Sequence, residues 1–304
     1  MQGKPGDQDP YVKRNLDLDK DALFFDWCIA ASVNPTRLRS VIGPPGCGKT
    51  TFLRRLLGEL QASGQMVVWY DAAAPPPAGV PGAAILLADG YDEVDDRKRE
   101  WVEQEVFTPF LFPADVPDPQ TRIVMSRRDE LALRAARLRW EDVRFPLEGL
   151  EAPRRQIEAL MALPPDAGVV VPAVVPAHVV AAIAALSPAA REALLDALQD
   201  SLTPNPFVNL CLLEEQLQHL AAPLAPQDYR DCLARYVARA RLDGKYVDIL
   251  IRRARQFPTG QFNLREYDDK QELGALVGAG AISHVHDSPR FQLEAAILRL
   301  VAHM

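Results

Sequence analysis

The sequence has few cysteines and few aromatic residues, and it lacks any long uninterrupted hydrophobic run. Its four cysteines lie far apart among 304 residues and show no C-x-x-C spacing, which argues against a disulfide framework and indicates a reducing compartment. The polar N-terminus has no apolar core of the kind found in signal peptides, and no segment reaches the apolar length of a membrane span. We therefore expect a cytoplasmic protein with no membrane partner.

Positive charge is also scarce relative to negative charge. The net charge is −7 and the isoelectric point is about 5.4, which argues against nucleic-acid binding driven by the overall field but leaves room for a local basic patch. Hydrophobic residues make up 48% of the chain and charged residues 25%, values that are ordinary for a globular protein. The length allows about two domains, each with its own core.

One segment carries most of the functional information. Residues Gly43–Thr50 read G-P-P-G-C-G-K-T, which is a complete phosphate-binding loop (P-loop) of the pattern G-x-x-x-x-G-K-T. Leu38–Ile42 can form a short strand before it, and residues 51–57 have helical spacing after it, which is the context that this motif requires. The glycines let the backbone approach phosphates closely, and the start of the helix favours negative charge.

The P-loop predicts ATP or ADP and Mg²⁺ as cofactors. Lys49 should reach the β- and γ-phosphates, and Thr50 should ligate Mg²⁺. The chain shows no N/T-K-x-D motif for reading guanine, which favours ATP over GTP. The residues expected to bind the nucleotide here are Gly43, Pro44, Pro45, Gly46, Cys47, Gly48, Lys49, Thr50 and Thr51.

Acidic residues after a second apolar run predict the rest of the nucleotide site. The run at residues 83–88 ends at Asp89, and we expect its strand to lie beside the P-loop strand and to bring Asp89 to Mg²⁺. Either Asp92 or Glu93 is then a candidate to polarise the attacking water, although a solvated acidic turn is the alternative. Arg127 ends a further predicted strand and is a candidate to neutralise the γ-phosphate, the alternative being a surface arginine.

The pattern of strands and helices changes along the chain. Residues 1–37 are a polar tail followed by a helical lead-in. Alternating strand and helix signals over residues 38–150 predict an α/β domain with a parallel sheet and helices on both faces. Residues 151–226 are helical with proline-rich links, and residues 227–304 add helices that end in a β-hairpin, which suggests a winged helix.

Several segments resemble the NACHT branch of the STAND P-loop NTPases, which are related to AAA+ ATPases. Asp89–Glu93 is similar to its D-G-x-D-E block, Met125–Arg127 resembles its T-S-R sensor, and Thr203–Cys211 resembles the N-P-hydrophobic-x-x-L segment of its helical lid. The resemblance implies that Pro206 packs on the adenine. It also implies that the two C-terminal segments form a helical lid and a winged-helix domain.

Two features depart from that family. The winged-helix hairpin of that family usually carries a histidine that contacts ADP, two residues after a phenylalanine. In this chain the residue two positions after Phe291 is Leu293. His284 or His286 can replace that histidine only if the hairpin is placed differently. The chain also shows no effector domain and no repeat sensor, so the resemblance implies either that these are separate partner proteins or that the sequence is a fragment of a larger protein.

The resemblance implies an ATPase that works as a slow molecular switch. ATP binding would change its conformation and drive homo-oligomerisation, and by analogy the switch would serve prokaryotic defence, including antiviral defence, or signalling. A pure scaffold that never turns its nucleotide over is a less favoured interpretation.

The main alternative is a DNA-associated AAA+ ATPase, such as a transposition regulator, a helicase loader or an Orc/Cdc6-like initiator. A cluster of basic residues would bind DNA phosphates if its members shared one face, whereas interspersed acids would make it an ordinary solvated surface. The basic residues of this cluster are Arg235, Arg239, Arg241, Lys245, Arg252, Arg253 and Arg255.

Overall fold

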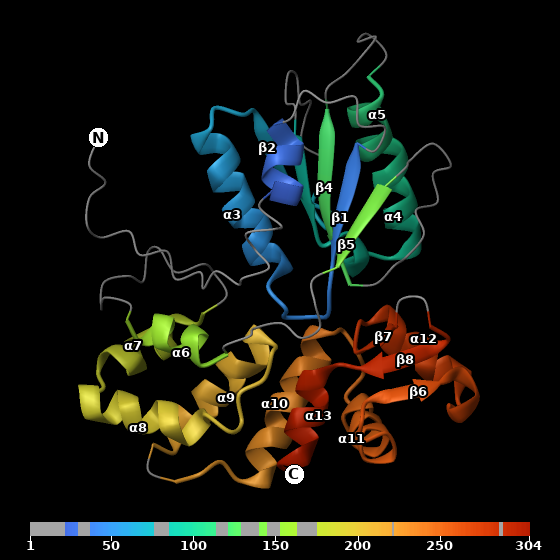
Figure 1. The fold of residues 1–304 in the computed structure, drawn as a ribbon. Coiled ribbons are helices and arrows are strands. Elements are labelled where there is room, and N and C mark those ends of the chain that lie inside the picture. The colour runs from blue at the N-terminus through green and yellow to red at the C-terminus, as the bar shows by residue number, and fades with distance from the viewer. Residues whose placement is uncertain are drawn as a thin grey trace. The chain divides into compact units, whose positions relative to one another are not determined.

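The structure is a computed structural model whose described residues fall into two compact units (Figure 1). The N-terminal unit comprises residues 15–44 and 48–146, and the C-terminal unit comprises residues 147–304 together with the loop segment Pro45–Cys47. The described residues are 22–29, 37–75, 85–113, 121–128, 140–144, 153–162, 175–220, 222–285 and 288–304.

Among the described residues of the N-terminal unit, five strands form one parallel sheet in the order β2-β3-β4-β1-β5. The strands are β1 (Leu38–Ile42), β2 (Val67–Asp71), β3 (Ile85–Asp89), β4 (Arg122–Arg127) and β5 (Trp140–Arg144). The expectation that β3 lies beside the P-loop strand β1 is wrong, because β4 lies between them. Every residue of β4 is buried, and its apolar stretch Ile123–Met125 suits a central strand covered on both faces.

Helices cover both faces of this sheet, as the alternating strand and helix signals predicted. Alternate strand residues such as Leu86 and Ile123 share a core with Val102 and Phe107, which belong to the helical run on one face. On the other face α3 (Lys49–Ala62) packs on β2, β3 and β4 (Figure 1). The remaining elements are η1 (Ala22–Asp26), α2 (Trp27–Ile29), η2 (Tyr91–Glu93), α4 (Asp96–Val102), η3 (Glu103–Phe107) and α5 (Thr108–Leu111).

The C-terminal unit is mainly helical. Its helices are α6 (Pro153–Met161), α7 (Ala177–Ala184), α8 (Pro188–Leu198), α9 (Pro206–Gln218), α10 (Pro226–Arg239), α11 (Tyr246–Gln256), α12 (Lys270–Gly278) and α13 (Ala295–Ala302). Ser187 caps α8, because its hydroxyl oxygen accepts a hydrogen bond from the backbone N–H of Ala190. One hydrophobic core runs from Ile157 to Val301, so the division of this unit into separate domains at residue 226 stays a prediction.

A small antiparallel sheet closes the unit, in the order β6-β8-β7. Its strands are β6 (Gln261–Asn263), β7 (Ile282–His284) and β8 (Arg290–Leu293), and the single turn η5 (Leu264–Glu266) follows β6. The predicted pairing of the last two strands is confirmed, and β6 is an addition that sequence analysis did not assign. No helix within the described ranges combines the length and the apolar character needed to cross a membrane.

Leu293 lies in the core of this unit. Its side chain is fully buried among other apolar side chains, a position that suits leucine. His284 is exposed on β7 and packs edge-on against the Phe291 ring, with the ring centres 5.2 Å apart. His286, the other candidate replacement, lies outside the described residues.

Candidate nucleotide-binding site

Three strands end at the same edge of the parallel sheet. Ile42 at the end of β1 pairs with Arg127 at the end of β4, and Ala88 of β3 pairs with Met125 of β4. The backbone N–H of Gly43 extends this register by donating to the Arg127 carbonyl at 3.1 Å. Because ligands of open parallel sheets bind at the carboxyl ends of the strands, this edge is the expected place for a nucleotide.

The P-loop has the backbone that its glycines predict. Gly46 and Gly48 adopt φ values of 79° and 97°, in the left-handed region that side chains other than glycine rarely adopt. Helix α3 begins directly after Gly48, and no side chain caps its first turn. The first N–H groups of a helix have no partner within the helix, so this helix start suits the binding of phosphate oxygens.

Lys49 is held within the loop that it is predicted to serve. Its ammonium group donates to the carbonyl oxygens of Gly43 at 2.7 Å and of Pro44 at 3.0 Å. Thr50 and Thr51 follow in the first turn of α3, and both are half-buried. A phosphate on this helix start would therefore meet a fixed cation and a neighbouring hydroxyl group.

Asp89 is held by Ser126, which sequence analysis placed in the sensor-like segment Met125–Arg127 without a role at Asp89. The Ser126 hydroxyl donates to Oδ1 of Asp89 and accepts a 3.3 Å hydrogen bond from the backbone N–H of Gly90. Ser126 therefore fixes the Asp89 carboxylate from the neighbouring strand β4. The signal available in the sequence was a hydroxyl residue at the end of that strand.

The predicted Mg²⁺ ligands fit the preferences of that ion. Mg²⁺ binds oxygen, and it usually takes one or two protein groups together with substrate phosphates and water. Thr50 supplies a hydroxyl and Asp89 a carboxylate, so the donor set is suitable. Among the described residues, no group of three or more His, Cys, Asp or Glu side chains is placed to hold a metal without such phosphates.

The two candidate bases have different surroundings. Glu93 is exposed and forms a 3.1 Å ion pair with the buried guanidinium of Arg128. Asp92 lies in η2, and its side chain is outside what the structure describes. The assignment of either residue as the base therefore stays a prediction, and Arg128 is an additional cation beside Glu93.

Arg127 is fully buried, so the alternative interpretation as a surface arginine is wrong. The hydroxyl of Tyr91 donates to Glu103 nearby. Burial and this hydrogen bond raise the pKa of Tyr91, while the charge of Arg127 acts in the opposite direction. Strand β4, which ends at Arg127, contacts η2, which contains Tyr91. The contact of Arg127 with a γ-phosphate stays a prediction.

The tip of the P-loop, Pro45–Cys47, belongs to the C-terminal unit, and Asn205 of that unit hydrogen-bonds to it. Nδ2 of Asn205 donates to the Pro45 carbonyl at 2.8 Å and also to the carboxylate of Glu294, and Oδ1 accepts from the Phe207 N–H at 3.0 Å. A Cβ at Gly46 would come within 2.5 Å of the Phe207 Cβ, so this position requires glycine. Asn205 was missed as a functional candidate, although an Asn–Pro pair at a helix start is a recognisable signal.

Pro206 is the first residue of α9. Its carbonyl accepts a 3.0 Å hydrogen bond from Nε2 of Gln156, a residue of α6. Its predicted contact with adenine is not tested by these contacts and stays a prediction.

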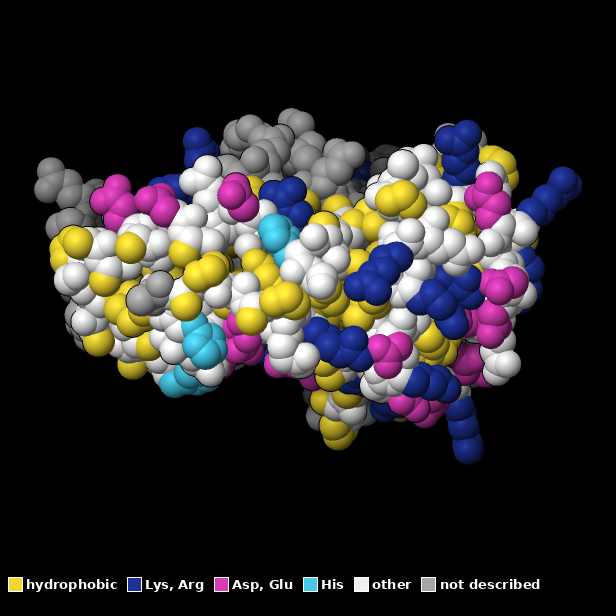
Figure 2. Space-filling model, turned by 90° about the horizontal axis from the view of Figure 1, so that it is seen from below, with side chains coloured by type: hydrophobic (Ala, Val, Ile, Leu, Met, Phe, Trp, Pro, Cys, Tyr) yellow, Lys and Arg dark blue, Asp and Glu magenta, His cyan; other side chains and the backbone are white. Residues whose placement is uncertain are grey.

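The predicted basic cluster does not form one free cationic face. Arg235 pairs with Glu214 and Glu215, and the buried Arg253 pairs with Glu272. Figure 2 likewise shows that Lys and Arg side chains on the face it presents are interspersed with Asp and Glu. Many of these charges therefore join elements of the unit to one another.

Comparison with known proteins finds similarity only at the level of solved structures. No family model matches the sequence, and no curated protein matches it. Cdc6p from Pyrobaculum aerophilum is 13% identical, with 96% of each chain covered and a TM-score of 0.40. A DNA replication initiation factor is 11% identical over 91% of each chain with a TM-score of 0.36, and Drosophila ORC bound to DNA is 15% identical, over 96% of this chain and 87% of that chain, with a TM-score of 0.31.

Proposed function

We propose that this protein is a Mg²⁺-dependent ATPase whose nucleotide binds at the carboxyl edge of the parallel sheet. The observation that carries the proposal is the meeting of two parts of the sequence at that edge. One is the P-loop, with Lys49 at the uncapped start of α3. The other is Asp89, fixed by Ser126 at the end of the adjoining strand β4.

Each residue has a distinct role in this proposal. The N–H groups at the start of α3 bind phosphate oxygens, and Lys49 balances the charge of the β- and γ-phosphates. Thr50 and Asp89 hold Mg²⁺, which offsets the charge that develops on the phosphates during transfer. Glu93 or Asp92 orients the attacking water, which completes hydrolysis to ADP and phosphate.

Ser126→Ala and Glu93→Gln test the two halves of this site. Removing the Ser126 hydroxyl should weaken Mg²⁺-dependent ATP hydrolysis by about tenfold, because Asp89 loses the hydrogen bond that orients it. Glu93→Gln, compared with Asp92→Asn, should lower hydrolysis while ATP binding persists. Unchanged hydrolysis in both Glu93→Gln and Asp92→Asn would show that neither Glu93 nor Asp92 is the base. A wild-type chain that fails to bind ATP would overturn the whole proposal.

The finer function that we favour is a nucleotide-controlled switch of the STAND type. The sequence resemblance supports it, as does the position of Asn205, which bonds both the P-loop carbonyl of Pro45 and Glu294 ahead of α13. A change at the loop tip would thereby reach the C-terminal helices. Particle mass measured with ADP and with a non-hydrolysable ATP analogue tests the assembly step, and identical masses would count against it.

A DNA-associated ATPase is the second candidate, and one observation favours it. The order α11-β6-η5-α12-β7-β8, with the sheet order β6-β8-β7, resembles that of a winged helix, and in this proposal α12 is the helix that enters a DNA groove. The many paired arginines argue for a smaller phosphate-binding surface than the sequence suggested. Binding to a short duplex that weakens steeply with salt would favour this candidate, and no binding at low salt would eliminate it.

A further inference from the structure

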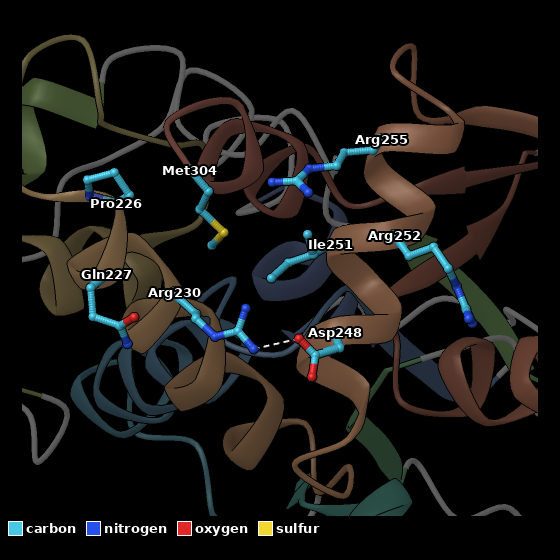
Figure 3. A pocket seen from close by; sticks show the side chains of 8 residues that line it. All are labelled: Pro226, Gln227, Arg230, Asp248, Ile251, Arg252, Arg255 and Met304. Carbon is cyan, nitrogen blue, oxygen red and sulfur yellow. Dashed lines mark hydrogen bonds and ion pairs between the residues drawn. The ribbon is translucent and has the colours of Figure 1, made fainter.

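A cavity in the C-terminal unit lies apart from the P-loop residues in the sequence and has no role in the proposed hydrolysis. It has a volume of about 530 Å³ and is lined by α10, α11 and the residue Met304 that follows α13 (Figure 3). Pockets that hold small ligands usually have volumes of about 300–1,000 Å³. The cavity is therefore large enough for a ligand of the size of a mononucleotide or a smaller phosphate ester.

The lining of this cavity carries an excess of positive charge. It includes three arginines, Arg230, Arg252 and Arg255, and one side-chain carboxylate, that of Asp248, and because Arg252 pairs with Glu272 the excess that faces the cavity is one charge. Arg230 bonds Asp248 across α10 and α11, and Arg252 points away from the cavity to pair with Glu272 (Figure 3). Both arginines are thereby fixed in position.

Arg255 differs from the other two arginines. It is exposed at the end of α11 and forms no ion pair with a carboxylate of the residues that the structure describes. Figure 3 shows its guanidinium group directed into the cavity, toward Met304. Arg255 and the fixed Arg230 both line the cavity, and two guanidinium groups in one lining suit an anion that can accept hydrogen bonds from both.

The wall between these charges is apolar. Ile251 of α11 is buried there, and the thioether side chain of Met304 is half-buried beside it. The cavity thus combines two guanidinium groups with an apolar surface, which matches a ligand that has both an anionic end and an apolar body.

We propose that this cavity binds a small phosphate monoester with an apolar or aromatic group. Its phosphate lies between Arg230 and Arg255, and its apolar group covers Ile251 and Met304. The three terminal oxygens of the phosphate allow both arginines to bond it at once.

The experiment uses the full-length chain with Lys49→Ala, so that binding at the P-loop is weakened and the second site is measured alone. Phenyl phosphate, inorganic phosphate and benzoate are titrated by calorimetry. Phenyl phosphate should bind more tightly than either of the others, because it alone offers both the dianion and the apolar ring. Arg255→Gln should lower its affinity by about tenfold or more, since a hydrogen bond to a charged group is lost.

The matched control is Arg265→Gln, which removes an exposed arginine that does not line the cavity and should leave the affinity unchanged. In the chain with Lys49 intact, Arg255→Gln should leave ATP hydrolysis unchanged, so failure of this proposal is distinguishable from failure of the proposed ATPase. Absence of phenyl phosphate binding, or equal binding in Arg255→Gln, would overturn the inference. A third outcome would also overturn it: the chain binds duplex DNA but not phenyl phosphate, and Arg255→Gln weakens the DNA binding. The arginines would then bind the phosphates of a nucleic-acid backbone.

Discussion

The two units use polar residues in different ways. In the N-terminal unit, Gly43, Asp89 and Ser126 come from distant parts of the sequence and meet at one edge of a sheet, where they face a predicted ligand. In the C-terminal unit, polar side chains mainly join helices to one another, as Arg253 and Glu272 do between α11 and α12. A charged residue at a strand end thus indicates chemistry, whereas a charged residue in a helical pattern more often indicates architecture.

The group around Glu272 is the clearest example of such architecture. Its carboxylate accepts hydrogen bonds from Arg253 at 2.8 Å, from Arg252 at 3.0 Å and from the hydroxyl of Tyr267. The Arg253 guanidinium also lies 4.0 Å from the centre of the Tyr267 ring. Burial, and then the hydrogen bond to Glu272, raise the pKa of Tyr267, so this hydroxyl stays protonated.

The largest effect is expected from Glu272→Ala, which tests the architectural role of charge in the C-terminal unit. Removing one partner of a buried ion pair leaves a buried charge without compensation, so the free energy of unfolding should fall by about 3–5 kcal/mol. Urea denaturation measures it. Asp268→Ala removes only the exposed partner of Arg253 and serves as the control; if it destabilised the chain as much as Glu272→Ala does, the buried pair would not be the cause.

Lys49→Ala should show the opposite behaviour in the N-terminal unit. Loss of a charged hydrogen-bond donor to phosphate should lower ATP affinity by about 10- to 100-fold. The free energy of unfolding should stay within about 0.5 kcal/mol of the wild-type value. The reason is that Lys49 donates to backbone carbonyls of its own loop, where water can take its place as the donor. Calorimetry with ATP measures the affinity. Arg54→Ala, which removes an exposed cation from the same helix, should bind ATP normally, and an equal loss there would contradict a specific role for Lys49.

Alkaline pH should lower the stability of both units through buried thiols. Burial raises the pKa of Cys211 from about 9 to about 11, and that of Cys28 to about 12. Below pH 9 these thiols are protonated in both the folded and the unfolded chain, so their titration does not lower the free energy of unfolding there. Between pH 9 and pH 11 the unfolded Cys211 thiol ionises and the folded one does not, so the free energy of unfolding should fall by up to about 1.4 kcal/mol per pH unit.

Urea midpoints at pH 8 and pH 10 measure this slope for the wild-type chain and for Cys211→Ala and Cys28→Ala. If the units unfold separately, each variant should reduce the slope of its own unit only, and part of the slope of the C-terminal unit should persist in Cys211→Ala because burial also raises the pKa of Cys232. If the free energy of unfolding of the C-terminal unit fell as steeply with pH in Cys211→Ala as in the wild-type chain, the Cys211 thiol would not contribute to the pH dependence.

The smallest effect is expected from Glu59→Ala in α3. Arg55 and Glu59 form a 2.8 Å ion pair one helical turn apart, and the Glu59 side chain is 38% exposed. Such surface pairs stabilise a protein by about 0.3–0.5 kcal/mol. Thermal unfolding should therefore detect a small shift at most, and a loss comparable to that of Glu272→Ala would erase the proposed difference between paired surface charges and paired buried charges.

For the N-terminal unit, local sequence motifs predicted the positions of the strands and of the P-loop correctly, but they did not predict the order of the strands in the sheet. The P-loop, the strand ending at Asp89 and the strand ending at Arg127 all lie where their sequence patterns indicated. The neighbour of β1 was predicted wrongly, because strand order depends on crossover connections and on which apolar strand fills the centre of the sheet. Burial of Arg127 was likewise invisible, since a terminal arginine of a strand can face either solvent or the core.

The sequence by itself determined that this chain has a P-loop at a strand-to-helix turn, because Gly46, Gly48 and Lys49 combine a backbone requirement with a chemical one. It also predicted that residues 151–304 are mainly helical, and α6 to α13 lie there. Only the tertiary structure decided which polar groups meet: Ser126 with Asp89, and Asn205 with Pro45. The physical reason is that a hydrogen bond between distant residues depends on packing of the whole unit, which no local pattern encodes.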